Sequence, residues 1–226
     1  MNKNSWTLFF VVALSTQLIG IMAKNETLQM VSKPLIVLSL AGYFITITKE
    51  RSKVFRLWVI LALFFSLLGD VLLMFQQKNE LFFLSGLSAF LLAQICYILF
   101  FNLARIREGI SGRWWLLLIV LIYYSLLISL LKPYLGSMKY PVIIYAVVVN
   151  FMFMLAMHLY FLPNKRAGLL IVLGGMCFII SDSLLAINKF FYSFEQAGFL
   201  IMLTYGLAQW LIIEGAVRYL HSIPKE

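Results

Sequence analysis

Apolar and polar positions alternate in long blocks along this chain. Eight apolar runs are separated by short segments that hold most of the charged residues. Each run has roughly 17 to 24 residues, which is long enough for a helix to cross the hydrocarbon core of a bilayer. The pattern predicts eight helices, over residues 6–23, 31–48, 54–75, 81–104, 114–131, 141–162, 168–187 and 197–219.

The composition agrees with this pattern. Of the 226 residues, 63% are hydrophobic and 12% are charged, against about 45–50% and about 25% in soluble domains. No segment is left for a sizeable soluble domain. The run at residues 6–23 is long for a signal peptide and lacks a clear small-residue cleavage site, so we interpret it as a first span. The predicted fold class is an all-α polytopic membrane protein, with residues 1–226 forming a single transmembrane domain.

The net charge is +9, and most of the basic residues lie in or next to the predicted loops. Loop lysines and arginines set topology and meet anionic lipid headgroups, so we favour these roles over nucleic-acid binding. With alternating helices, 12 of the 18 basic residues fall on one side of the membrane. The positive-inside rule then predicts cytoplasmic N- and C-termini in a multi-pass protein of the cell (inner) membrane. The residues on the richer side are Lys3, Lys49, Arg51, Lys53, Arg56, Arg105, Arg107, Arg113, Lys165, Arg166, Arg218 and Lys225.

Three motifs recur in the same order in the two halves of the chain. Residues 69–73 (Gly-Asp-Val-Leu-Leu) resemble 181–185 (Ser-Asp-Ser-Leu-Leu), and residues 92–94 and 207–209 both read Leu-Ala-Gln. Pro34 and Pro141 each lie at the start of a predicted helix. A lysine precedes Pro34 by one position and Pro141 by two. The pattern predicts an internal repeat with halves at about residues 1–110 and 111–226. Four spans in each half would make the halves parallel, related by an axis along the membrane normal.

Asp70 and Asp182 lie within two of the apolar runs. A carboxyl group at bilayer depth costs on the order of 2.5 to 3.5 kcal/mol on insertion scales, so it indicates a functional site. Each aspartate is five residues before the predicted end of its helix, so the repeat would place both at the same depth. The alternative is a structural role, with each carboxyl hydrogen-bonded to neighbouring helices. Ser181 and Ser183 flank Asp182 and are candidate partners.

Five further polar residues in the spans are candidate substrate contacts: Lys33, Gln94, Tyr97, Tyr205 and Gln209. Gln94 and Tyr97 are three residues apart, and Tyr205 and Gln209 are four residues apart, so the two members of each pair share one helix face. Amides and phenols often hydrogen-bond between membrane helices, which is the structural alternative. At the predicted start of its helix, Lys33 either reaches a carboxylate or a phosphate, or extends to the lipid headgroups.

Other chemistry-bearing residues indicate no cofactor. Cys96 and Cys177 lie in apolar runs, and His158 and His221 lie at the membrane side opposite the aspartates, so no metal site is predicted. Glu214 and Arg218, four residues apart, are interpreted as an ion pair on a helix surface. No nucleophile-elbow, phosphate-loop or zinc-helix motif occurs.

The motifs together resemble those of the YhhN-like family, which includes the lysoplasmalogenases. The resemblance covers the second to the eighth span. It is carried by residues 32–34 (Ser-Lys-Pro), 68–74, 93–97, 181–186 and 205–212. It implies an eight-helix membrane hydrolase that cleaves the vinyl-ether bond of a lysophospholipid, and it maps the two intramembrane aspartates of the family onto Asp70 and Asp182 as the catalytic pair. The products would be a fatty aldehyde and a glycerophospho-headgroup.

The residues are suited to that reaction, because vinyl-ether hydrolysis needs an acid and a base, and two carboxyl groups can supply both. Two other function classes stay open. The same aspartate pair suits a proton-coupled transporter of a small molecule or lipid. A structural partner of another membrane protein would instead tolerate asparagine at both positions. The headgroup, the chain length, the acid and base assignment and the oligomeric state are not specified by these patterns.

Overall fold

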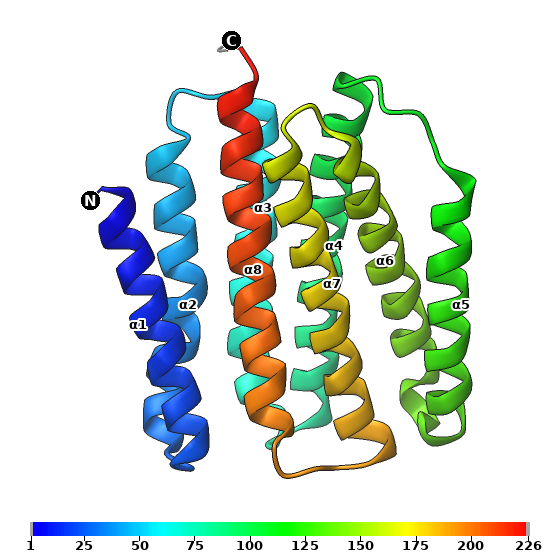
Figure 1. Cartoon of the computed structure of the whole chain (residues 1–226). Coiled ribbons are helices and arrows are strands. Elements are labelled where there is room, and N and C mark those ends of the chain that lie inside the picture. The colour runs from blue at the N-terminus through cyan, green and yellow to red at the C-terminus, as the bar shows by residue number, and fades with distance from the viewer. Residues whose placement is uncertain (1, 225–226) are drawn as a thin grey trace.

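A computed structural model describes residues 2–224 and contains, within that range, eight helices long and apolar enough to cross a membrane (Figure 1). The predicted all-α class and the predicted number of spans are confirmed. The helices are α1 (Lys3–Met22), α2 (Glu26–Ile47), α3 (Lys53–Met74), α4 (Glu80–Arg107), α5 (Trp114–Leu131), α6 (Lys139–His158), α7 (Lys165–Ala186) and α8 (Ala197–Ser222).

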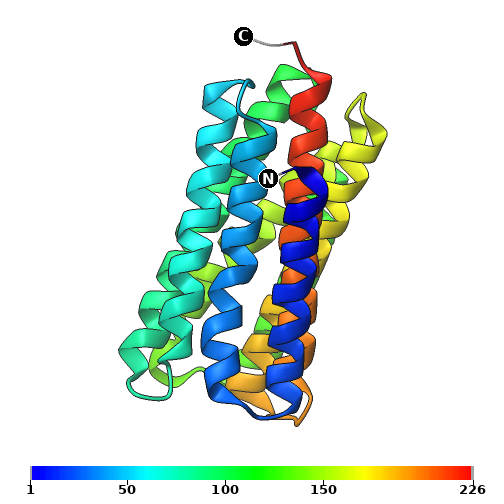
Figure 2. The ribbon, with the colours of Figure 1, turned by 90° about the vertical axis from the view of Figure 1, so that its left-hand side faces the viewer.

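The eight helices run side by side along one direction, with α1 and α5 at opposite edges of the bundle (Figures 1 and 2). Both ends of the described chain point to the same end of the bundle, as an even number of passes requires. Lys225, which the charge count included, lies outside the described residues. The closest-packed pairs are α7 with α8, α3 with α4, and α1 with α2. The internal repeat and the side of the membrane that holds the termini stay predictions.

The second helix begins earlier than expected. Its first residue is Glu26, because the side chain of Asn25 accepts a hydrogen bond from the backbone N–H of Leu28 and so caps the helix. Pro34 therefore lies inside α2, and the prediction that it opens the helix was wrong. As a consequence, Lys33 sits two turns into the helix rather than at its start. From there its side chain can point into the bundle.

The seventh span continues beyond its predicted end at Ile187. After Ala186 the chain forms a π-helical turn over Ile187–Phe191, closed by a hydrogen bond from the N–H of Tyr192 to the carbonyl of Ile187. Such turns often occur near functional sites. Here the turn prolongs the helix that carries Asp182, so the helical segment beyond Asp182 is longer than the one beyond Asp70.

Small residues let the helices approach closely. A Cβ atom added to Gly174 of α7 would lie 2.8 Å from the backbone nitrogen of Ile212 in α8 and 3.0 Å from the carbonyl oxygen of Ala208. A Cβ atom added to Gly69 of α3 would lie 2.6 Å from the ring of Phe90 in α4. Close contact of this kind replaces the hydrophobic effect as the source of helix association in lipid. These glycines therefore hold together the two helix pairs that carry the aspartates.

Replacement of Gly174 by alanine should destabilise the protein by about 1–3 kcal/mol, because the added methyl group meets backbone atoms that cannot move independently. The measurement is the thermal unfolding midpoint of the detergent-purified variant. Gly112→Ala is the matched control, since its Cβ atom would meet only the Arg105 side chain at 3.7 Å. Equal midpoints for the two variants would contradict the close packing of α7 on α8.

Candidate active site

A cavity of about 480 Å³ lies within the bundle, at the end away from the chain termini. Its volume is typical of sites for small organic ligands. Seven of the helices and the connection after α3 contribute to its wall. Four of the seven predicted site residues line it: Lys33, Asp70, Asp182 and Tyr205. The two aspartates, 112 positions apart in the chain, thus share one cavity.

Asp70 has two partners on other helices. The hydroxyl of Tyr205 from α8 donates a hydrogen bond to Oδ2 at 2.7 Å, and Nζ of Lys33 from α2 lies 3.5 Å from Oδ1. The side chain of Asp70 is only 3% exposed and that of Lys33 is 15% exposed. A carboxylate removed from water needs such compensation, because its charge is otherwise strongly disfavoured in hydrocarbon. The pair of Lys33 and Asp70 therefore belongs to the interior of the bundle.

Asp182 has a different environment. It is half-buried, and Oδ2 accepts a hydrogen bond of 2.7 Å from the hydroxyl of Tyr145 in α6. No cation of the described chain forms a salt bridge with it. The prediction that the flanking serines serve Asp182 was wrong: Ser181 donates to the carbonyl of Ile201, and Ser183 donates to the carbonyl of Ile179. Because both hydroxyls are used elsewhere, Oδ1 of Asp182 accepts no hydrogen bond from residues 2–224.

The other three predicted site residues are buried behind the cavity wall and do not line it. The hydroxyl of Tyr97 donates to Oε1 of Gln209 at 2.7 Å. Nε2 of Gln209 lies 3.0 Å from Oγ of Ser66 and 3.3 Å from the hydroxyl of Tyr205. This chain of contacts supports Tyr205, which in turn holds Asp70. Gln94 is fully buried beside Tyr145 and makes no hydrogen bond of ordinary geometry within the described chain.

Tyr145 is the site residue that the sequence did not indicate. It stands in α6 among apolar residues, and no motif marks it. Its position offered one signal: a tyrosine within a span needs a partner for its hydroxyl, and few carboxyl groups are available there. The pairing could be assigned only after the structure placed α6 against α7.

The remaining wall contains two kinds of side chain. Apolar side chains come from α3, α4, α7 and α8: Leu73, Phe83, Leu87, Phe90, Leu185, Ile201 and Met202. Polar and charged side chains, with Glu26 and Lys78 both exposed, lie toward the mouth. The cavity thus offers both apolar and polar surface, as a site for an amphiphile requires.

Metal binding finds no support among the residues described. They contain no group of three or more histidine, cysteine, aspartate or glutamate side chains close enough to hold a metal ion. The side-chain nitrogen of Asn150 donates to the carbonyl of Ala146 at 2.8 Å, and its Oδ1 is buried without a hydrogen-bond partner among residues 2–224. The ion pair of Glu214 with Arg218 exists but not on a helix surface: the Glu214 side chain is only 7% exposed. That part of the prediction was wrong, because α1 and α2 cover this face of α8.

A bundle of eight apolar helices within residues 2–224, with a cavity between them, defines a polytopic membrane protein with a candidate ligand site. Residues 28–216 match the YhhN family, and the chain belongs to that family. It is 31% identical over 157 residues to lysoplasmalogenase TMEM86B of Rattus norvegicus, covering 70% of this chain and 60% of that protein. It is 32% identical over 163 residues to a lysoplasmalogenase of Mycobacterium bovis, covering 71% and 60%.

Human lysoplasmalogenase TMEM86A is 30% identical over 166 residues, covering 71% of this chain and 65% of that protein. The matched region thus spans less than two thirds of the length of these relatives. No solved structure matches the chain significantly.

Replacement of Lys33 by methionine should lower the free energy of unfolding by on the order of 3 kcal/mol, because it leaves the buried carboxylate of Asp70 without its cation. The double variant Lys33→Met/Asp70→Asn should recover most of that loss, since no buried charge remains. Thermal unfolding midpoints of the wild type, both single variants and the double variant complete the cycle. Lys78→Met, at the exposed mouth, serves as the control. Additive effects of the two substitutions would contradict the pairing.

Proposed function

We propose that this protein hydrolyses the vinyl-ether bond of lysoplasmalogen-type lysolipids, with Asp70 and Asp182 as the catalytic acid–base pair. The observation that carries the proposal is that both aspartates line one cavity whose wall also contains apolar side chains and exposed polar side chains. Membership of the YhhN family and similarity to proteins named lysoplasmalogenase supply the substrate class. Lysophospholipids would be the substrates, the bilayer their source, and no cofactor would be needed.

The reaction consumes one water molecule. A proton adds to the alkene carbon remote from the ether oxygen, and the adjacent carbon becomes an oxocarbenium ion. Water adds to that carbon and loses a proton, giving a hemiacetal. The carbon–oxygen bond to glycerol then breaks as the ether oxygen takes up a proton. The products are a fatty aldehyde and a glycerophospho-headgroup with a free hydroxyl. An acid is needed for the first step and a base for the second.

The contacts of the two aspartates favour different roles. The ammonium group of Lys33 near Oδ1 of Asp70 stabilises a charged carboxylate, which suits activation of water and stabilisation of the oxocarbenium ion. Asp182 accepts a hydrogen bond from a tyrosine hydroxyl and has no cation beside it among residues 2–224, which suits a neutral acid that donates the proton. In the collapse of the hemiacetal the proton on Asp70 passes to the ether oxygen, and the hydroxyl proton returns to Asp182. Both side chains thereby regain their starting states.

The cavity wall suits the two parts of such a substrate. The alkenyl chain would lie against Leu87, Phe90 and Met202, and the headgroup would lie at the mouth near Glu26 and Lys78. Lys33 is engaged with Asp70, so we assign it to the charge of that carboxylate rather than to the phosphate. Tyr97 and Gln209 would act indirectly, by holding Tyr205 in place, and Gln94 would act only by packing beside Tyr145.

The proposed function includes an orientation of the protein in the membrane and a symmetry between the two halves of the chain. The basic residues near the termini would face the cytoplasm of the cell (inner) membrane, so the cavity mouth would face the opposite side. The two halves of the chain would be parallel repeats, each contributing one aspartate. A proton-coupled transporter is the alternative on the same residues. It is less favoured because Asp70 and Asp182 each lie within a continuous α-helix, and the π-helical turn after α7 begins only at Ile187, whereas transport sites typically have helices interrupted at the site itself.

The test is incubation of the purified protein with a panel of alkenyl and acyl lysophospholipids, followed by mass spectrometry for aldehyde and fatty acid. Aldehyde should be released from the alkenyl lipids. Asp70→Asn and Asp182→Asn should each lower that rate by a factor of at least about 100, the usual contribution of a general acid or base. Glu195→Gln, an exposed acid at the same end and outside the cavity, is the control and should keep the wild-type rate.

Two outcomes would overturn this mechanism. Wild-type aldehyde release by the double asparagine variant would exclude the aspartates as catalysts. Movement of an unaltered lipid across a vesicle membrane under a pH gradient, without aldehyde formation, would establish the transporter instead.

Replacement of Tyr145 by phenylalanine should lower kcat about 10-fold or more with little change in KM, because Asp182 loses the hydrogen bond that holds it. Tyr123→Phe is the matched control: its hydroxyl is 2.5 Å from Oγ of Ser183, and neither aspartate contacts it by hydrogen bond. Steady-state aldehyde formation by the two variants provides the comparison. An equal effect in both would assign Tyr145 a structural role only.

A further inference from the structure

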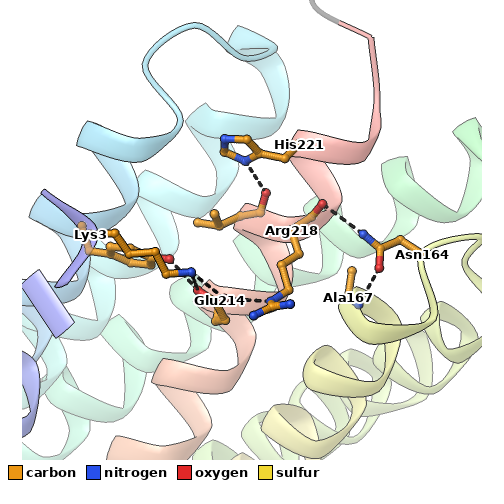
Figure 3. Close-up of polar contacts among 8 residues, drawn as sticks. Lys3, Asn164, Ala167, Glu214, Arg218 and His221 are labelled. Carbon is orange, nitrogen blue, oxygen red and sulfur yellow. Dashed lines mark hydrogen bonds and ion pairs between the residues drawn. The ribbon is translucent and has the colours of Figure 1, made fainter.

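A second buried carboxylate lies near the opposite end of the bundle from the cavity. Glu214 of α8 receives Nζ of Lys3 from α1 at 2.9 Å and Nε of Arg218 at 2.7 Å, both on Oε1 (Figure 3). The hydroxyl of Tyr43 from α2 donates to Oε2. The cluster ties three helices together. Its two cations and one carboxylate leave one positive charge in excess.

The excess charge is accessible. The side chains of Lys3 and Arg218 are 47% and 40% exposed, whereas that of Glu214 is 7% exposed. Arg218 uses Nε for the carboxylate, and its two Nη groups form no hydrogen bond with any residue between 2 and 224. A guanidinium group presents these two donors in one plane, which matches two oxygens of a phosphate. The cluster is thus a partly unused anion-binding group.

A groove of about 620 Å³ extends from this cluster along the outside of the bundle. Leu8 and Val11 of α1 form one wall, Leu170 of α7 forms the other, and Trp210 of α8 lies between them. Trp210 is held by stacking on Phe10, so the groove has a rigid floor. The walls belong to membrane-spanning helices, so the groove opens toward lipid.

The basic side chains of the groove come from the start of one span and from near the end of another. Lys3 is the first residue of α1, and Arg218 lies four residues before the end of α8 at Ser222, about 6 Å along the axis. Basic residues at this level of a span meet phosphate groups at the membrane surface. Leu8 and Val11 lie further along α1, at the level of the acyl chains. The groove therefore has a charged end and an apolar body in the order found in a phospholipid.

We propose that this groove is a binding site for a phospholipid with an anionic headgroup. The phosphate accepts hydrogen bonds from the Nη groups of Arg218 and from the proton of Lys3 that Glu214 does not use, and one acyl chain lies along Leu8, Val11 and Leu170. A net negative headgroup is favoured over a zwitterionic one because the cluster is net positive, and Lys165 and Arg166 add exposed positive charge at the same end of the bundle. The site is separate from the cavity and independent of the reaction proposed above.

The experiment is native mass spectrometry of the detergent-purified protein with phosphatidylglycerol or phosphatidylcholine of the same chain length. Phosphatidylglycerol should bind at least ten times more tightly than phosphatidylcholine. Leu170→Trp should weaken that binding about ten-fold by filling the groove, whereas Leu169→Trp should leave it unchanged. The neighbouring Leu169 is the matched control because it is the same residue type on the same helix, has an exposed side chain, and is not part of the groove.

Arg218→Lys provides a second variant that keeps a cation beside Glu214 while it removes the planar pair of donors. It should weaken phosphatidylglycerol binding several-fold without a change in the unfolding midpoint. Equal affinity for the two lipids, or equal binding by the Leu170 and Leu169 variants, would overturn the proposal. Displacement of the lipid by millimolar inorganic phosphate would assign the cluster to a soluble anion, and a lipid-free dimer that excludes phosphatidylglycerol would assign the groove to a second copy; either result would also overturn it.

Discussion

The structure depends on the cost of a charged or polar group in hydrocarbon, where no water can serve as its partner. The three carboxylates within the helical bundle meet this constraint in the same way: each accepts a hydrogen bond from a tyrosine on another helix. The pairs are Asp70 with Tyr205, Asp182 with Tyr145 and Glu214 with Tyr43. Tyrosine suits this role because its ring is apolar and its hydroxyl carries no charge. These bonds fix the rotation of the helices relative to one another.

The difference between the three carboxylates lies in their cations. Glu214 has two, Asp70 has one, and Asp182 has none within the described chain. Glu214 is thereby committed to holding helices together, and its cations have donors left for a lipid. Asp70 and Asp182 keep unequal environments in a shared cavity, which is the condition for an acid and a base at one site. One helix, α8, contributes to both ends, through Tyr205 at the cavity and Glu214 at the basic end.

Several features followed from local patterns in the chain. Hydropathy and length predicted all eight spans, because a membrane helix must satisfy its own backbone and bury about 20 residues. The cost of intramembrane charge singled out Asp70 and Asp182, and both line the cavity. The family resemblance was confirmed over residues 28–216. These predictions needed only the order of residues along the chain and no contact between helices.

The contacts between helices could not be predicted in this way. In a soluble helix the apolar stripe shows which face is buried, but here Leu8 and Val11 are exposed while Phe10 and Leu14 of the same helix are buried. Lipid is as apolar as the bundle interior, so hydrophobicity does not distinguish the two faces. For that reason the amino-acid sequence by itself determined only where the spans lie and which carboxyl groups lie within them. Only the tertiary structure decided that Tyr145 serves Asp182, that Lys33 reaches Asp70, and that Glu214 is buried, because these depend on how neighbouring helices are rotated.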